Sequence, residues 1–284
     1  MDSESIFSEY QDIIAQWETK QKLPHIAGIF IPSESDFTKG HKNQFGYFWL
    51  EDNSVGFMYI QLNEKLPKRL SEFNTKTLIG QSPLTLLSHL GDSDELQHLM
   101  AFGVLSAVSQ HILSAGRYEF NYTMDPFGSL NILPQDMVGM VGFFPPLVNF
   151  CEQHDIPLIV IEKKPELVQK KQNFEVCLDP SRLNQCNKVL ITGTTILNNS
   201  IDEVLSQCKN AKKIAVVGPS ASILPDPLFR RGVTVIGGTQ VRDIGLFHTL
   251  FQSNNSWNPA VQKYCISRED YPGWNNFLRK INYL

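Results

Sequence analysis

The residues of this chain that could do chemistry are small, hydroxylic or acidic, and they follow five successive apolar runs. These runs cover residues 136–144, 156–162, 188–195, 212–220 and 232–238. In an open parallel sheet, ligands bind beyond the carboxyl ends of the strands, where the connecting loops converge. We therefore expect one ligand site, formed by Gly142, Phe143, Pro145, Glu162, Thr194, Thr195, Asn198, Gly218, Pro219, Ser220, Pro225, Asp226, Gly238 and Thr239.

The side chains in this set indicate two kinds of contact with a ligand. Thr194, Thr195 and the Gly-Pro-Ser segment at 218–220 would donate hydrogen bonds to an anionic group, and Glu162 or Asp226 would hold a hydroxyl, an amine or a cation. Each residue also has a simpler structural interpretation. Threonines cap helices, glycines form tight turns, and acids at strand ends are often solvated or close Asx turns. The sequence leaves both interpretations open.

The first turn of the predicted sheet argues against an ordinary dinucleotide site. It contains Gly139-x-x-Gly142 followed by Pro145 and Pro146, and a G-x-G-x-x-G pattern is absent. Cys151-x-x-His154 places a thiol and an imidazole one helical turn apart, but no second pair with ligand spacing accompanies it. We therefore expect neither NAD or FAD binding nor a structural zinc site. A divalent cation held by the Asp226 and Glu162 oxygens is the metal hypothesis that remains.

The first part of the chain predicts a small α+β domain over residues 1–91. A helix over about 4–20 has apolar residues at the helical period, and strands are expected at 25–32, 45–50 and 54–62. The last two strands are joined by a short polar segment typical of a hairpin. Ser82 and Pro83 indicate the start of another helix.

The second domain, over 92–284, is expected to be a Rossmann-like, doubly wound α/β domain with a parallel sheet. It begins with the longest helix, over about 93–115, for which Asp92 and Glu95 have the spacing of a capping box. Near-continuous valine and isoleucine runs then alternate with helices, as a sheet covered on both faces requires. The lysine-rich segment around 163–171 is interpreted as a solvated face, and residues 252–284 yield no prediction.

Composition limits the class of partner. The chain has 25 Lys+Arg against 29 Asp+Glu, a formal net charge of −4, so it has no global attraction for nucleic acid or for an anionic membrane. Its longest apolar run, 138–148, is far too short to span a bilayer and contains two prolines. An acidic start without a signal-peptide pattern and five irregularly spaced cysteines favour reduced thiols. We expect a cytoplasmic protein.

Three segments in this order resemble one known family, described as "putative heavy-metal chelation". They are VGMVGFFPPLV (138–148), ITGTTILNNSIDEVL (191–205) and GPSASILPDPLFRRGVTVIGG (218–238). The resemblance implies a Rossmann-like domain that follows a small domain similar to the N-terminal domain of enolase. It also implies a cleft between the two domains, lined by the strand-end residues given above, Glu162 excepted. The residues themselves supply no thiol or imidazole ligand set at those positions.

The sequence thus supports three hypotheses about function. The first is a protein that binds or processes a small molecule in the cleft between the two domains, at the carboxyl ends of the strands. The second, implied by the resemblance, is metal binding or heavy-metal chelation. The third is a non-catalytic scaffold that forms a homodimer through its Rossmann-like domain. No nucleophile–base pair is identifiable, so the sequence names no reaction.

Overall fold

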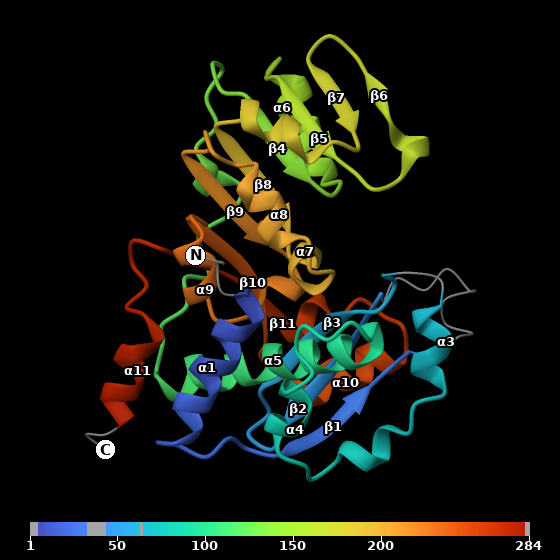
Figure 1. The fold of residues 1–284 in the computed structure, drawn as a ribbon, viewed down its shortest axis with the longest axis vertical. Helices are drawn as coiled ribbons and strands as arrows, with labels where there is room; N and C mark the ends of the chain where they lie inside the picture. Colours follow the sequence, from blue (N-terminus) through green and yellow to red (C-terminus); the bar gives the residue numbers. More distant parts are fainter. Residues whose placement is uncertain (1–4, 33–43, 63–64, 282–284) are drawn as a thin grey trace.

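The fold contains two β-sheets joined by a long central helix (Figure 1). The computed structural model describes residues 5–32, 44–62 and 65–281. The smaller sheet is antiparallel, with strand order β1-β2-β3, and the larger, mostly parallel sheet has the order β11-β10-β9-β8-β4-β5-β7-β6. The predicted α/β fold class is therefore confirmed, with a three-stranded N-terminal sheet and an eight-stranded C-terminal one.

The predicted elements of the N-terminal part are present. Helix α1 spans Ile6–Glu18. At its start, the Ser5 hydroxyl accepts a hydrogen bond from the backbone of Phe7. Glu4, where we expected the helix to begin, lies outside the described residues. The short segment between β2 and β3 closes the expected hairpin. The strands are β1 (Ile26–Phe30), β2 (Phe45–Leu50) and β3 (Val55–Tyr59).

Three helices follow the small sheet. They are α3 (Leu66–Ser71), α4 (Pro83–Leu87) and α5 (Glu95–Ala115). Ser82 caps α4, as predicted. The predicted capping residue of α5 is wrong: Asp94 accepts hydrogen bonds from the backbone of Leu96 and Gln97, whereas the Asp92 carboxylate pairs with the His89 ring.

Helix α5 forms the centre of the fold. It packs against β2 and β3, and between Leu96 and Leu113 the side chain of Gln97 alone is not buried. Among the described residues it is the one helix long and apolar enough to cross a membrane, yet 89% of its most apolar window is buried inside the fold. A core helix passes the same test of length and composition, and α5 is packed as one.

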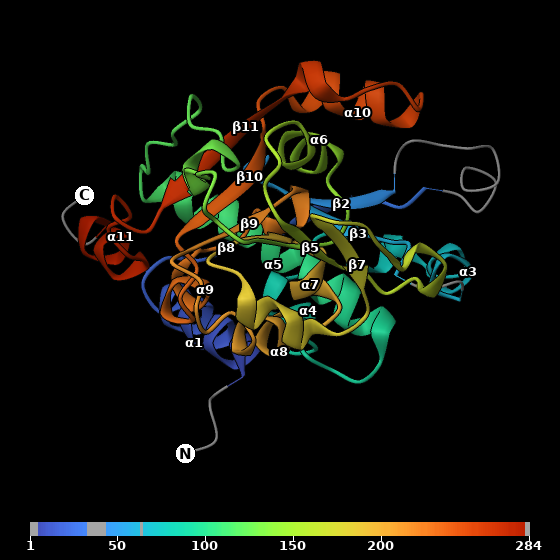
Figure 2. The same cartoon turned by 90° about the horizontal axis from the view of Figure 1, so that it is seen from above.

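The larger sheet is covered on both faces, as the sequence predicted. On one face, Met140 and Val160 belong to a hydrophobic cluster that includes residues of α6 (Pro145–Gln153). Their neighbours Val141 and Ile161 point to the opposite face and belong to a second cluster, which includes residues of α8 (Ile201–Ser206). Figure 2 shows α6 and α8 on opposite sides of the sheet. The predicted strands are β4 (Val138–Val141), β5 (Leu158–Ile161), β8 (Lys188–Thr192), β9 (Lys213–Val217) and β10 (Val235–Val241).

The sequence missed both edges of this sheet. The lysine-rich segment contributes β6 (Gln169–Lys170) and leads into β7 (Phe174–Cys177), and the C-terminal stretch contributes β11 (Val261–Ser267), which is antiparallel to β10. The remaining helices are α7 (Thr194–Leu197), α9 (Asp226–Arg230), α10 (Ile244–Gln252) and α11 (Trp274–Ile281).

Packing between the two sheets is extensive. The outer face of the small sheet carries Tyr47 and Phe57, which pack against Phe247 and Phe251 of α10. On the other side of the small sheet, Gln110 of α5 donates to the carbonyl of Ser222 (3.2 Å) and to the hydroxyl of Tyr264 (2.9 Å). Because these polar groups are buried, each must keep its hydrogen-bond partner. The hydrogen bonds therefore fix how α5 and the small sheet pack against the larger sheet.

Candidate functional site

The parallel sheet has a topological switch point between β4 and β8. The chain enters the sheet at β4, moves outward through β5 and β7, and then returns to the other side of β4 to build β8, β9 and β10. Loops that leave β4 and β8 therefore diverge at the carboxyl edge of the sheet. Ligands of open α/β sheets bind in the crevice that such divergence opens. The β4–β8 edge is therefore where this topology favours a ligand site.

Gly142 begins the loop that follows β4. Its φ of +82° suits glycine, and a Cβ at this position would lie 3.0 Å from Cγ2 of Thr192, so the two strand ends touch. The next side chain, Phe143, is 48% exposed. Pro145 and Pro146 then occupy the first turn of α6 and remove two N–H groups that would otherwise bind phosphate. The loop offers an aromatic surface and no phosphate cradle.

The loop after β8 presents two hydroxyl groups. Thr192 donates from Oγ1 to Oγ1 of Thr194 (3.2 Å), and both side chains are partly exposed. Thr195 is buried and donates to the carbonyl of Thr192 (2.8 Å), so it closes the turn. Oδ1 of Asn198 accepts from the backbone and hydroxyl of Ser200. Thr192 and Thr194 are therefore the hydroxyls that a ligand could reach, and Thr192 was missing from the predicted set.

The loop after β9 combines an open glycine with a buried hydroxyl. Gly218 has a φ of +113°, and a Cβ there would meet no atom of the described residues within 4 Å. Ser220 is 2% exposed, and its hydroxyl hydrogen-bonds to no other described residue. Gly193 holds this loop close to that of β8, because a Cβ on it would lie 2.6 Å from the backbone nitrogen of Ala221. The loops after β4, β8 and β9 thus meet at one edge.

Two of the predicted residues lie beside the loop after β9, but they are engaged in pairing within the fold. We expected Gly238 and Thr239 to end their strand, but β10 continues to Val241, and both residues are paired with β11. Thr239 is buried and donates from its backbone to Oγ of Ser222 (2.9 Å). The expected end of this strand is wrong because the antiparallel partner β11 extends it.

Asp226 is engaged in a structural contact. It opens α9 immediately after the buried Pro225, and its Oδ2 accepts from the hydroxyl of Tyr271 (2.6 Å) while Oδ1 accepts from the backbone of Trp274 (3.1 Å). Burial is the main reason why the pKa of this carboxyl is raised. Both oxygens thus hold the C-terminal segment, and we assign Asp226 to the docking of α11.

Glu162 lies far from Asp226. It follows β5, is partly exposed, and accepts from the backbone of Lys163 (3.1 Å). Strands β5 and β9, which lead to the two acids, are separated by β4 and β8, so about 14 Å lies between them at the usual strand spacing. The two carboxylates are not placed to share one cation.

The described residues do not fit a heavy-metal site. Among them, no group of three or more His, Cys, Asp and Glu side chains is arranged to hold a metal ion. Soft metals bind thiolates, and burial raises the pKa of Cys151 to about 11 and those of Cys186, Cys208 and Cys265 to about 12. All five cysteines are free thiols, and Cys177 alone is partly exposed. At neutral pH these groups are protonated.

This burial predicts a specific pattern of thiol reactivity. In the native protein near neutral pH, an aromatic disulfide reagent should modify Cys177 first. The four buried thiols should react at least tenfold more slowly, because they are protonated and because the reagent cannot reach them. In denaturant all five should react at once. Spectrophotometric thiol counting with and without denaturant checks this, with Cys177→Ser removing the fast phase. Rapid modification of four or five thiols in the native protein would contradict it.

Two solved structures have the same fold. One is a protein of unknown function from Pyrococcus horikoshii, with a TM-score of 0.68 and 15% identity over 92% of this chain and 99% of that chain. The other, of unknown function from Desulfitobacterium hafniense DCB-2, has a TM-score of 0.69 and 16% identity over 94% of this chain and 100% of that one. At this identity the similarity shows the fold alone.

Sequence comparison identifies the family. An uncharacterized protein of Methanocaldococcus jannaschii is 29% identical over 237 residues, which covers 79% of this chain and 87% of that protein. The model of the family described as "putative heavy-metal chelation" matches residues 125–266, half of the 284-residue chain, from the segment before β4 into β11. The two solved structures are described as members of the same family. This chain belongs to that family of unknown function, described as "putative heavy-metal chelation".

Proposed function

We propose that this protein binds a small polar organic molecule at the carboxyl edge of its parallel sheet, at the switch point between β4 and β8. The observation that carries the proposal is that three loops begin side by side there, before those of β4 and β8 diverge. A Cβ on Gly142 would lie 3.0 Å from Cγ2 of Thr192, and one on Gly193 would lie 2.6 Å from the backbone of the Ser220 loop, whereas a Cβ on Gly218 would meet no described residue within 4 Å. An edge built this way brings backbone and hydroxyl groups close to a ligand without side-chain obstruction.

The chemistry of this edge suits a ligand with both a planar and a polar part. The exposed ring of Phe143 offers a surface for stacking, and the hydroxyls of Thr192 and Thr194 each donate and accept hydrogen bonds. Glu162, on the next strand outward, would accept from a hydroxyl or an amine. The residues gathered here are hydroxyls, glycines and one carboxylate, so we propose binding and name no reaction.

Removing the two hydroxyls tests the proposal. The double variant Thr192→Val, Thr194→Val keeps the side-chain shape and should weaken binding at least tenfold, because each lost ligand hydrogen bond contributes about 1 kcal/mol. The measurement is a thermal-shift screen of nucleosides, sugar phosphates and small carboxylates, followed by titration of any compound that raises the melting temperature. We expect at least one such compound for the native protein.

The control is Thr249→Val, at an exposed position on α10 where, among the described residues, the hydroxyl bonds only to the carbonyl of Gly245. It should leave binding unchanged. A ligand whose affinity is the same in the native protein and in the double variant would place the binding site elsewhere and contradict the proposal.

A further inference from the structure

The carboxyl edge of the sheet brings four chemically different residues into one row. The last residues of β7, β5 and β4 pair side by side, and Val141 of β4 also pairs with Ile191 of β8. The next position on each of these strands forms a row in the order Leu178, Glu162, Gly142, Thr192. Adjacent strands are about 4.8 Å apart, so the row spans about 14 Å. It has room for one elongated small molecule.

Glu162 lies in this row beside a position that has no side chain. Its backbone donates to the carbonyl of Cys177 (3.0 Å), and the backbone of Gly142 donates to the carbonyl of Ile161 (3.1 Å), so both residues are held at the edge. The partly exposed carboxylate accepts from the backbone of Lys163 (3.1 Å) and forms no ion pair with a described residue. Its two oxygens can therefore accept from two neighbouring hydroxyls of a ligand.

Exposed apolar side chains gather around Glu162. Among the described residues, eight large apolar side chains are exposed, and four of them lie at this edge: Phe143, Leu167, Val168 and Leu178. Phe143 follows Gly142 directly. Because Gln169 of β6 pairs with Val176 of the antiparallel β7, Leu167 and Val168 lie beside the carboxyl end of β7. Grouped apolar side chains of this kind mark a surface that a ligand or a partner covers.

The groups along the row thus follow the order apolar, carboxylate, open glycine, hydroxyl. A nucleoside carries complementary groups in the same order, which are the planar base, the vicinal diol of the ribose and the 5′ hydroxyl. We propose that the ligand of this edge is a nucleoside without a phosphate. The base rests on the exposed apolar side chains, the diol donates to Glu162, and the 5′ end reaches the hydroxyl of Thr192. This inference rests on the proposed function, because it names the ligand of the same edge.

The start of α6 argues against a phosphate on this ligand. Pro145 and Pro146 remove two N–H donors there, and Phe144, which precedes them, supplies no side-chain cap. The carboxylate of Glu162 would also repel an anion. Lys163 and Lys164 are exposed cations in the loop after β5, so the affinity for a 5′-phosphate must be measured directly.

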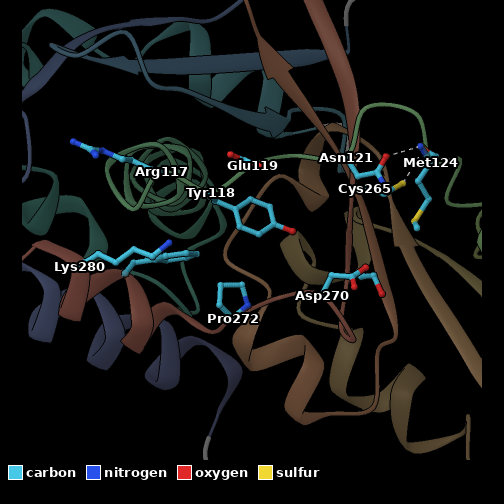
Figure 3. Close-up of a pocket in the computed structure, with 11 residues that line it drawn as sticks. Arg117, Tyr118, Glu119, Asn121, Met124, Cys265, Asp270, Pro272 and Lys280 are labelled. Atoms are coloured by element: carbon cyan, nitrogen blue, oxygen red, sulfur yellow. Dashed lines mark hydrogen bonds between the residues drawn. The ribbon is translucent and has the colours of Figure 1, made fainter.

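A hollow of about 440 Å³ lies away from this edge and is large enough for a similar ligand. Because Ser267 of β11 pairs with Val235, the first residue of β10, the hollow lies at the amino edge of the parallel strands. Figure 3 shows Arg117 and Lys280 on one side of it and Asp270 on the other. Asp270→Asn therefore reports on binding in the hollow, and Glu162→Gln reports on binding at the carboxyl edge.

The test is calorimetric titration of the full chain with adenosine, guanosine, cytidine and uridine, and then with modified forms of any nucleoside that binds. We expect at least one nucleoside to bind, and its 2′,3′-dideoxy form to bind at least tenfold more weakly, because that form lacks the diol. The 5′-phosphate form should bind no more tightly than the nucleoside. D-Ribose, which lacks the base, should not bind at millimolar concentration.

Glu162→Gln should weaken binding of the nucleoside at least tenfold and change binding of the dideoxy form less than twofold. The matched control is Glu166→Gln, at an exposed acid in the same loop, which should leave binding unchanged. Asp270→Asn should also leave it unchanged.

Three results would overturn this inference. They are the absence of binding by all four nucleosides, nucleoside binding that Glu162→Gln leaves unchanged, and a 5′-phosphate form that binds at least tenfold more tightly than the nucleoside. The proposed function would survive any of them if another compound from the thermal-shift screen bound and lost affinity in the double variant Thr192→Val, Thr194→Val. A failure of the inference is thus distinguishable from a failure of the proposed function.

Discussion

Substitution of Gly56 by alanine should lower the free energy of unfolding by about 3 kcal/mol or more, or prevent folding altogether. A Cβ at position 56 would lie 2.1 Å from the backbone nitrogen of Ala107 and 2.3 Å from the carbonyl oxygen of Gly103. Both atoms belong to the backbone of α5, and backbone atoms cannot move aside as the end of a flexible side chain would. Overpacking of this kind forces helix and sheet apart in the centre of the core.

The matched control is Gly245→Ala on the exposed side of α10. Among the described residues, a Cβ there meets only Oδ1 of Asp243, at 3.5 Å, so the substitution should raise stability by up to about 1 kcal/mol through helix propensity. Urea unfolding followed by tryptophan fluorescence measures both variants. Equal stability of Gly56→Ala and the native protein would show that β3 and α5 are not packed as described.

Substitution of Asp226 by alanine should lower the free energy of unfolding by about 3 kcal/mol. The change leaves the hydroxyl of Tyr271 and the backbone N–H of Trp274 without their acceptor, and each buried donor left without a partner costs about 1–3 kcal/mol. Trp274 and Phe277 anchor α11 in the core, so the loss should also expose this helix to proteolysis. The same urea titration, with limited proteolysis, measures the effect.

The isosteric variant Asp226→Asn separates charge from hydrogen bonding. Burial raises the pKa of Asp226, so its stabilising contribution is complete below the unfolded value of about 3.9 and falls as pH rises through the higher folded value. The stability of the native protein relative to Asp226→Asn should therefore decrease as the pH rises above about 4. Asp12→Ala, at an exposed position on α1, should change stability by less than about 0.5 kcal/mol. An Asp226→Ala protein as stable as this control would contradict the structural role.

Local patterns predicted most of the fold. The Val/Ile runs of β4, β5, β8, β9 and β10 are near-continuous because both faces of the sheet are covered. Such a run predicts a buried strand even when the helices that cover it are not known. Edge strands carry no such signal. β6 and the first half of β11 are exposed and rich in lysine and glutamine, so their composition is that of a loop.

The candidate site was predicted only in part, because its assembly depends on strand order. Gly142, Thr194, Gly218 and Ser220 do reach one edge, since each directly follows a parallel strand. No local sequence pattern predicts that β8 pairs with β4 and so creates the switch point. For the same reason, Asp226 could not be read as a contact of Tyr271, which lies 45 residues further along the chain.

Native mass spectrometry of the gently purified chain, paired with elemental analysis, distinguishes an organic ligand from a bound metal. We expect a bound organic mass without stoichiometric metal. That adduct should be lost in the double variant Thr192→Val, Thr194→Val and kept in Thr249→Val. A stoichiometric heavy metal without any organic adduct, retained in the double variant, would contradict the account and make metal binding the function.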